Sequence, residues 1–222
     1  MPTIQLIDYE ASASCRSVNL RCFEAFPPLT CTLEGGHVYG LSGDIRSGAW
    51  AFSWALGGRA KESFGEILMD SVHAAPKNLA SRACFIGEPY FSGVNSRIFP
   101  GTVGSCLNKA LAAGRTGWTL KQLVKAFCLT PERFDRSPLH VHYAQSWFLS
   151  AAVGFASGKE IFCFPYLPAD TLRAVDVMFR EGIFALLREH GKIVLLPSAH
   201  RERLISVCDQ VIDIASVVST TR

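Results

Sequence analysis

The chain has 222 residues, 49% of them hydrophobic and 18% charged, a balance that excludes an intrinsically disordered protein. Its formal net charge of +3 is small for this length and no Lys/Arg block occurs, so no nucleic acid is expected as a partner. The eight cysteines form no Cys-x-x-Cys pair, which favours reduced, buried thiols and predicts no metal centre. Neither an N-terminal signal nor an apolar run of ~20 residues is present, so the chain is not expected to cross a membrane by itself.

The N-terminal residues are predicted to be rich in strands. Residues 3–9 alternate apolar and polar side chains as a half-buried strand does, and residues 29–33 form a second run before a Gly-Gly turn. Between them, residues 11–28 end in Pro27-Pro28 and are predicted to be irregular. These segments predict a small antiparallel β edge.

A strand, a glycine loop and a helix are predicted next. The strand covers residues 37–41, Gly43 and Gly48 bound the loop, and the apolar run that follows suits a helix. This is the order of a phosphate-binding P-loop, in which backbone N–H groups and a helix N-terminus surround an anion. Such a loop also needs a Lys and a Ser or Thr, but this chain has Ala49 and Trp50 there.

The remaining segments alternate in type. Strands are predicted over residues 63–70 and 82–89, the second broken by Pro89, and residues 102–149 are predicted to be mainly helical. The C-terminal third then alternates strand, helix, strand, helix and strand over residues 160–164, 170–190, 192–197, 201–208 and 210–214. This order predicts a parallel sheet with right-handed connections and helices on its faces.

Several short phrases, in a fixed order, carry a resemblance to a known family. They occur at residues 37–43, 65–70, 86–88, 99–107, 191–200 and 208–213. Together they resemble the nucleotide-binding (ATPase) subunit of ABC transporters along almost the whole chain. The resemblance implies an α/β P-loop NTPase (RecA-like) core with a parallel sheet, a small antiparallel β subdomain and an inserted helical subdomain. It implies one domain over residues 1–222, with the helical subdomain at about 90–150.

The resemblance also assigns the glycine loop. Gly43, Ser47 and Gly48 match the family's P-loop, whereas residues 49–51 (Ala-Trp-Ala) replace its Lys-Ser-Thr run. Arg46 is the side chain of this loop that could supply a substitute charge. The vestigial P-loop, including Ala49 and Trp50, is therefore the candidate site for binding ATP and Mg²⁺.

The family's other motifs are altered as well. Glu88 stands where the family carries a strand-end Gln, and Gln145 is the one remnant of the signature sequence. Pro165-Tyr166 occupies the place of the Asp-Glu pair, so the Mg²⁺-binding carboxylate and the general base are missing. His200 is the candidate for the family's switch histidine. His200 and Glu88 are thus the candidate catalytic residues, and no metal ligand is predicted.

These changes predict a degenerate, catalytically inactive ABC subunit. The resemblance implies that it forms a homodimer, or a heterodimer with an active homologue, and docks through its helical subdomain onto a transmembrane permease. It is then expected in the cytoplasm, held peripherally at the inner face of the cell membrane. A permease partner predicts an exposed apolar patch within residues 90–150.

Two alternatives stay open. One is a soluble interaction or ligand-binding module with a pocket around Trp50, Tyr166 and Glu88, although the helical spacing of Trp50 among apolar residues favours a core residue. The other is an atypical ATPase whose catalytic groups have moved to Arg46, Glu88 and His200.

Overall fold

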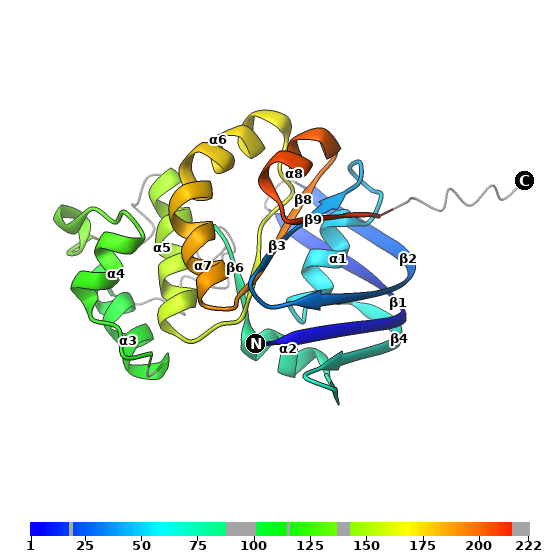
Figure 1. Ribbon diagram of the computed structural model, residues 1–222, viewed down its shortest axis with the longest axis horizontal. Helices are drawn as coiled ribbons and strands as arrows, with labels where there is room; N and C mark the ends of the chain where they lie inside the picture. The colour runs from blue at the N-terminus through cyan, green and yellow to red at the C-terminus, as the bar shows by residue number, and fades with distance from the viewer. Residues whose placement is uncertain (18–19, 88–100, 115, 137–142, 215–222) are drawn as a thin grey trace, which may run out of the picture.

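The computed structural model describes residues 1–17, 20–87, 101–114, 116–136 and 143–214. Within them, a five-stranded sheet forms the centre of the molecule (Figure 1). Its strand order is β6 (Ala83–Phe85), β7 (Ile161–Cys163), β8 (Ile193–Ser198), β3 (His37–Ser42) and β9 (Gln210–Asp213). All neighbouring strands are parallel. The parallel core expected from the C-terminal pattern is confirmed.

A second, antiparallel sheet lies beside the first. Its order is β2 (Leu20–Glu34), β1 (Thr3–Ser17), β4 (Glu62–Met69) and β5 (Val72–His73). The expectation of irregular structure over residues 11–28 is wrong, because the β1–β2 pairing continues from Ala11↔Phe26 to Ser17↔Leu20. The prolines at 27 and 28 are compatible with this pairing because they lie where its register shifts, between Tyr9↔Leu29 and Ala11↔Phe26, and because β2 is an edge strand.

Helices cover both faces of the parallel sheet. They are α1 (Ala49–Leu56), α2 (Pro76–Arg82), α3 (Val103–Gly114), α4 (Leu120–Ala126), α5 (Tyr143–Ala156), α6 (Ala169–Phe179), α7 (Ala185–Glu189) and α8 (Arg201–Val207), with a 3₁₀ turn at Pro131–Arg133. Two expectations need correction. Arg82 closes α2, so the strand expected over residues 82–89 is only β6 within the described residues. A π-helical turn, Arg180–Phe184, divides the helix expected over residues 170–190.

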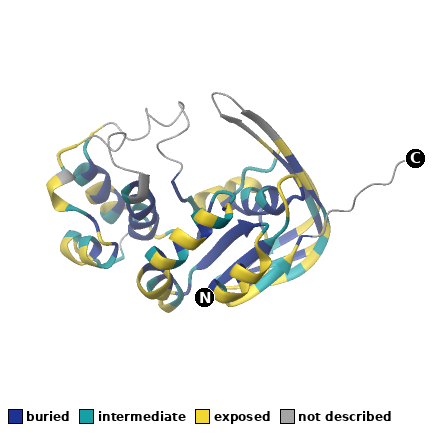
Figure 2. Cartoon of the chain, turned by 90° about the horizontal axis from the view of Figure 1, so that it is seen from above, coloured by how far each residue is buried: buried dark blue, intermediate teal, exposed yellow. Residues whose placement is uncertain are grey.

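Alternate residues of the parallel strands face two separate cores. In β8, Ile193 and Leu195 face α1 and the antiparallel sheet, whereas Val194 and Leu196 face α5 to α8. Helix α1 therefore lies between the two sheets (Figure 1). Seen from above, the buried strands run through the middle of the molecule and the exposed residues lie on the outer helices and strands (Figure 2). The β3–α1 unit is thus fixed on both sides by apolar packing.

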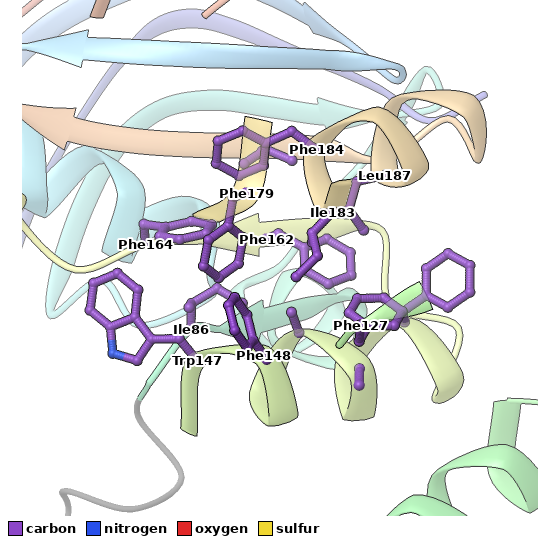
Figure 3. Close-up of a cluster of buried hydrophobic side chains, with 14 of the residues drawn as sticks. Ile86, Phe127, Trp147, Phe148, Phe162, Phe164, Phe179, Ile183, Phe184 and Leu187 are labelled. Atoms are coloured by element: carbon purple, nitrogen blue, oxygen red, sulfur yellow. The ribbon is translucent and has the colours of Figure 1, made fainter. Parts of the chain in front are cut away.

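Aromatic side chains attach α5 to the parallel sheet. Trp147 of α5 meets Phe164 with ring centroids 5.8 Å apart, and Phe148 meets Phe179 of α6 at 5.1 Å. Phe164 and Phe179 pack edge to face at 5.5 Å (Figure 3). Such pairs add about 0.5–1.5 kcal/mol each beyond the burial of their area. Residues 90–100, the expected start of the helical subdomain, lie outside the described residues.

Two composition-based expectations can also be compared with the structure. No helix among the described residues is long and apolar enough to span a bilayer. Among the cysteines whose side chains are described, Cys106 and Cys163 are buried. Cys128 is exposed, so the expectation that the thiols are buried does not hold at that position.

Candidate anion-binding loop

The glycine loop, residues 43–48, lies at the carboxyl edge of the parallel sheet. It follows the last residue of β3, Ser42, which is in parallel register with Ser198 of β8 and Asp213 of β9. Ligands of open parallel sheets bind outside the carboxyl ends of the strands. The loop then enters α1, whose N-terminus carries the partial positive charge of its unpaired N–H groups.

The loop keeps a tight backbone course. Its N–H groups at Gly43 and Ser47 donate to the carbonyls of Ser198 (3.1 Å) and Asp44 (2.9 Å). Gly48 has a φ of 100°, and a Cβ there would lie 2.5 Å from the Ala25 carbonyl oxygen of β2. Only glycine fits such a position without a shift of the backbone. Strand β2 therefore runs directly against the loop.

A buried carboxylate from β2 meets this loop. Oε1 of Glu24 accepts a hydrogen bond from the Arg46 backbone N–H at 2.8 Å. The Glu24 side chain is only 7% exposed, and its Oε2 has no hydrogen-bond partner among the described residues. Arg46 itself has a φ of 75°, a left-handed conformation that costs a non-glycine residue about 1 kcal/mol or more.

Sequence reasoning missed Glu24. The signal that could have found it is strand alternation, since Glu24 and Phe26 point inward from β2 while Phe23 and Ala25 point outward. An acidic residue in the inward phase of a strand is an exception that needs a partner. That signal was hidden because residues 11–28 were expected to be irregular.

Tyr166 reaches the same loop from beyond β7. Burial raises the pKa of its phenol, backbone hydrogen bonds with Ala199 and Ile45 oppose the rise, and the charges of Asp44 and Glu24 add to it. The phenol therefore stays protonated at neutral pH, next to the loop and to Glu24. The residue at the predicted Asp-Glu position thus contacts the loop but brings no carboxylate.

The two altered P-loop positions lie at the start of α1. Ala49 has no exposed surface. Trp50 is partly buried, and its ring centroid lies 4.8 Å from that of Trp54. Trp54 in turn packs on Phe85 at 4.9 Å, so an aromatic row extends from Trp50 along α1 toward β6. Trp50 has the packing of a core residue.

The other candidate residues are placed differently. His200 is exposed at the start of α8, and its backbone N–H donates to Ser198 Oγ at 3.2 Å. It shares the carboxyl edge with the loop. Gln145 lies in the first turn of α5, where its side chain accepts from Thr130 Oγ1 at 3.2 Å and donates to the Cys128 carbonyl at 3.5 Å. Glu88 lies outside the described residues.

The residues present do not fit a Mg²⁺-bound polyphosphate. A polyphosphate needs positive charge at the loop, whereas the Arg46 N–H already meets a carboxylate and the position of the phosphate-binding ammonium is the buried Ala49. Among the described residues, no group of three or more His, Cys, Asp or Glu side chains could hold a metal ion.

Comparisons with known proteins agree on the architecture. No family model matches the chain. It is 24% identical over 196 residues to the energy-coupling factor transporter ATP-binding protein EcfA2 of Leuconostoc mesenteroides, covering 83% of this chain and 67% of that protein. It superposes on cbiO1 of Clostridium perfringens, part of the ABC transporter complex cbiONQ, with a TM-score of 0.66. That match has 11% identity and covers 96% of this chain and 84% of cbiO1.

The chain has the ATP-binding-cassette fold. The chain also superposes on a putative ABC transporter ATP-binding protein from Pyrococcus furiosus with a TM-score of 0.64. That match has 14% identity and covers 96% of this chain and 97% of the other. The resemblance to ABC nucleotide-binding subunits found in the sequence is confirmed, and so is the expected P-loop NTPase fold class. In this cassette, the glycine loop lies between β3 and α1, where the sequence predicts a P-loop.

Proposed function

We propose that this cassette is an ABC transporter subunit that does not hydrolyse ATP. The observation that carries the proposal is the charge pattern of the glycine loop, where Ala49 and Trp50 replace the Lys and hydroxyl residue and Glu24 brings a negative charge. Phosphoryl transfer depends almost entirely on electrostatic stabilisation and positioning. Each missing charge-assisted hydrogen bond removes roughly 1.5–3 kcal/mol.

The end of β7 supports the same proposal. Pro165-Tyr166 follows this strand where the family resemblance places the Mg²⁺-binding carboxylate and the general base. Neither residue can ligate Mg²⁺ through a carboxylate or accept a proton from water at neutral pH. ATP and Mg²⁺ are therefore not proposed as cofactors of this chain.

A transporter role would require partners, and the comparisons support that class of partner. The cbiO1 protein belongs to a transporter complex, and the ATP-binding cassette MJ0796 has been solved as a dimer bound to ADP and phosphate. We propose that this cassette pairs with itself or an active homologue and sits at the inner face of the cell membrane on a permease. The unit over residues 90–150 is the proposed docking subdomain.

A second candidate, a free-standing interaction module on the same fold, is favoured by one observation. The large hydrophobic side chains that are exposed among the described residues lie outside the range 90–150; they are Met1, Ile7, Phe23, Ile45, Phe64, Val72, Val177 and Ile205. The described part of that range thus lacks the apolar patch that a permease contact predicts. No docking residue is assigned there.

Hydrolysis and binding of Mg²⁺-ATP test the main proposal. We expect the purified chain to release no phosphate and to show no thermal stabilisation with ATP up to millimolar concentration. The Ala49→Lys/Trp50→Ser variant provides the comparison in which the motif is restored. Mg²⁺-dependent phosphate release by the wild-type chain, lost in Arg46→Ala or His200→Ala, would instead support an ATPase with relocated groups.

Cell fractionation tests whether the chain is bound to a transmembrane permease. A permease-bound cassette is expected in the membrane fraction and, after detergent extraction, in a complex with a protein that has several ~20-residue apolar spans. Recovery of the chain entirely in the soluble fraction would favour the free-standing module.

A further inference from the structure

The glycine loop and the N-terminus of α1 form an anion cradle by their backbone alone. Helix α1 begins at Ala49 after Gly48, which has a positive φ, and neither a side-chain cap nor an acidic residue in its first turn balances its dipole. A loop of this kind attracts an anion through its N–H groups without any lysine. An anion is therefore expected to neutralise the partial positive charge of this loop and helix N-terminus.

Glu24 has the features of that anion. It reaches the loop from β2, 22 residues earlier in the sequence, and its Oε1 accepts the Arg46 N–H at 2.8 Å. More than nine-tenths of the side chain is buried, although it shares the inward face of its strand with the apolar Phe26. Its Oε2 has no hydrogen-bond partner among the described residues, so folding alone does not explain a carboxylate here.

Two hydroxyl groups lie at the loop that Glu24 meets. Ser47 Oγ, also buried and without a partner among the described residues, lies in the same loop. Tyr166 places a protonated phenol close enough for Glu24 to influence its pKa. Hydroxyl donors and backbone N–H groups are the groups that bind carboxylates and phosphates alike.

We propose that the glycine loop is an anion site occupied from within by the Glu24 carboxylate. A phosphate-type anion from outside binds the loop only when this carboxylate is absent, because both would use the Arg46 N–H and because their charges repel. The proposal deepens the proposed function, on which it rests, by naming what fills the nucleotide's place.

Pyrophosphate binding to Glu24 variants, without Mg²⁺, tests the proposal. We expect Glu24→Ala to bind pyrophosphate at least about tenfold more tightly than the wild type, since the competing charge-assisted hydrogen bond is removed. Glu24→Gln keeps the shape and an acceptor but not the charge, so its gain is expected to be intermediate. Because Glu24 is buried, the glutamine variant decides the test where the alanine variant does not fold.

Glu66→Ala is the matched control. Glu66 is exposed on β4 of the same antiparallel sheet, so this variant changes the net charge equally without touching the loop. Its pyrophosphate affinity is expected to stay within about twofold of the wild type. Equal affinities for the Glu24 and Glu66 variants would overturn the proposal, because the gain would then come from net charge alone.

The backbone amide resonance of Arg46 gives a second readout. We expect its proton to shift upfield in Glu24→Ala, where the carboxylate is lost, and to return downfield as pyrophosphate is added to that variant. An Arg46 amide that does not respond to Glu24→Ala would contradict the internal contact. Failure of the proposed function is recognised separately, by Mg²⁺-dependent ATP hydrolysis in the wild-type protein.

Discussion

At the amino edge of the parallel sheet, charged side chains are paired across strands, whereas at the carboxyl edge two buried polar atoms beside the glycine loop have no partner within the part of the chain that the structure describes. Arg82, just before β6, pairs with Glu160 before β7 and with Asp70 at 2.7 Å. Arg188 pairs with Asp209 before β9 at 2.8 Å, and Asp209 also accepts the Val38 N–H at 2.7 Å. These pairs fix the entry points of neighbouring strands.

The carboxyl edge differs in the hydrogen bonding of its buried polar atoms. Glu24 Oε2 and Ser47 Oγ are both buried without a hydrogen-bond partner among the described residues, and the edge's ion pair, Arg201 with Asp213, is largely exposed. A buried polar atom without a partner costs about 1–3 kcal/mol. The amino edge also holds one such atom, His37 Nδ1, but its carboxylates Asp70, Glu160 and Asp209 are paired with arginines. Glu24 beside the glycine loop has no such ion pair among the described residues. A fold retains such costs mainly where a site needs them, so the difference assigns stability to the amino edge and supports the proposed binding role of the carboxyl edge.

Among the proposed variants, Arg82→Ala should have a large destabilising effect at the amino edge. The variant leaves Asp70 and Glu160 without their shared cation, so we expect the free energy of unfolding to fall by about 1–2 kcal/mol. Urea denaturation measures it. Arg203→Ala, on the exposed surface of α8, is the control and is expected to change stability by less than about 0.5 kcal/mol. Equal losses in both variants would mean that the pairing at Arg82 contributes nothing.

Acid titration should remove the stabilisation that the second ion pair of the amino edge, Arg188 with Asp209, provides. Partial burial raises the pKa of Asp209, but hydrogen bonds from Arg188 and the Val38 N–H outweigh it, and the pKa lies below its ordinary value. The stabilisation is therefore complete above the unfolded pKa of about 4 and disappears as the pH falls through the folded pKa.

The expected size of this contribution is about 1 kcal/mol or less, because the pair is partly solvated. Denaturation curves between pH 6 and pH 2.5 measure it for the wild type and for Asp209→Asn. The difference between the two proteins should shrink as the pH falls below about 4. A difference that stays constant over this range would show that the charge of Asp209 is not the stabilising feature.

Ser47→Ala should have the smallest effect at the carboxyl edge, with the opposite sign. Removing a buried hydroxyl that has no partner in the described part of the chain leaves the free energy of unfolding unchanged or raises it by up to about 1 kcal/mol. Ser198→Ala is the control from the same edge, because its Oγ donates to the Leu167 carbonyl at 2.6 Å and accepts the His200 N–H. We expect that variant to lose about 1–2 kcal/mol. A comparable loss in Ser47→Ala would contradict the contrast between satisfied and unsatisfied groups.

Much of the fold could be predicted because its signals are local. The buried strands at 161–163 and 193–198 and the helices between them follow from apolar runs and periodicity, which need no distant contact. The β1–β2 pairing over residues 11–28 could not be predicted, because Pro27-Pro28 is ordinarily a loop signal and the position of β2 at the sheet edge depends on the whole topology. Helix α2 was not anticipated, since its seven residues bury only Leu79.

The candidate site was predictable only in part. Spacing alone identified Gly43, Gly48 and the altered positions after them, since a glycine loop between a strand and a helix has a characteristic pattern. Tyr166 was placed by the family resemblance. Glu24 could not be found in this way, because its contact with Arg46 depends on the register of a hairpin and on the approach of that hairpin to the loop.

The ends of the antiparallel sheet limit how another chain can meet it. One outer strand, β2, carries two consecutive prolines, which cannot donate hydrogen bonds, and the other, β5, has only two residues. Unpaired strand edges otherwise act as templates for adding strands from other chains, which leads to aggregation. Both outer strands of this sheet are poor templates, so a protein that joins this surface is expected to lie across the face of the sheet, with its side chains making the contact.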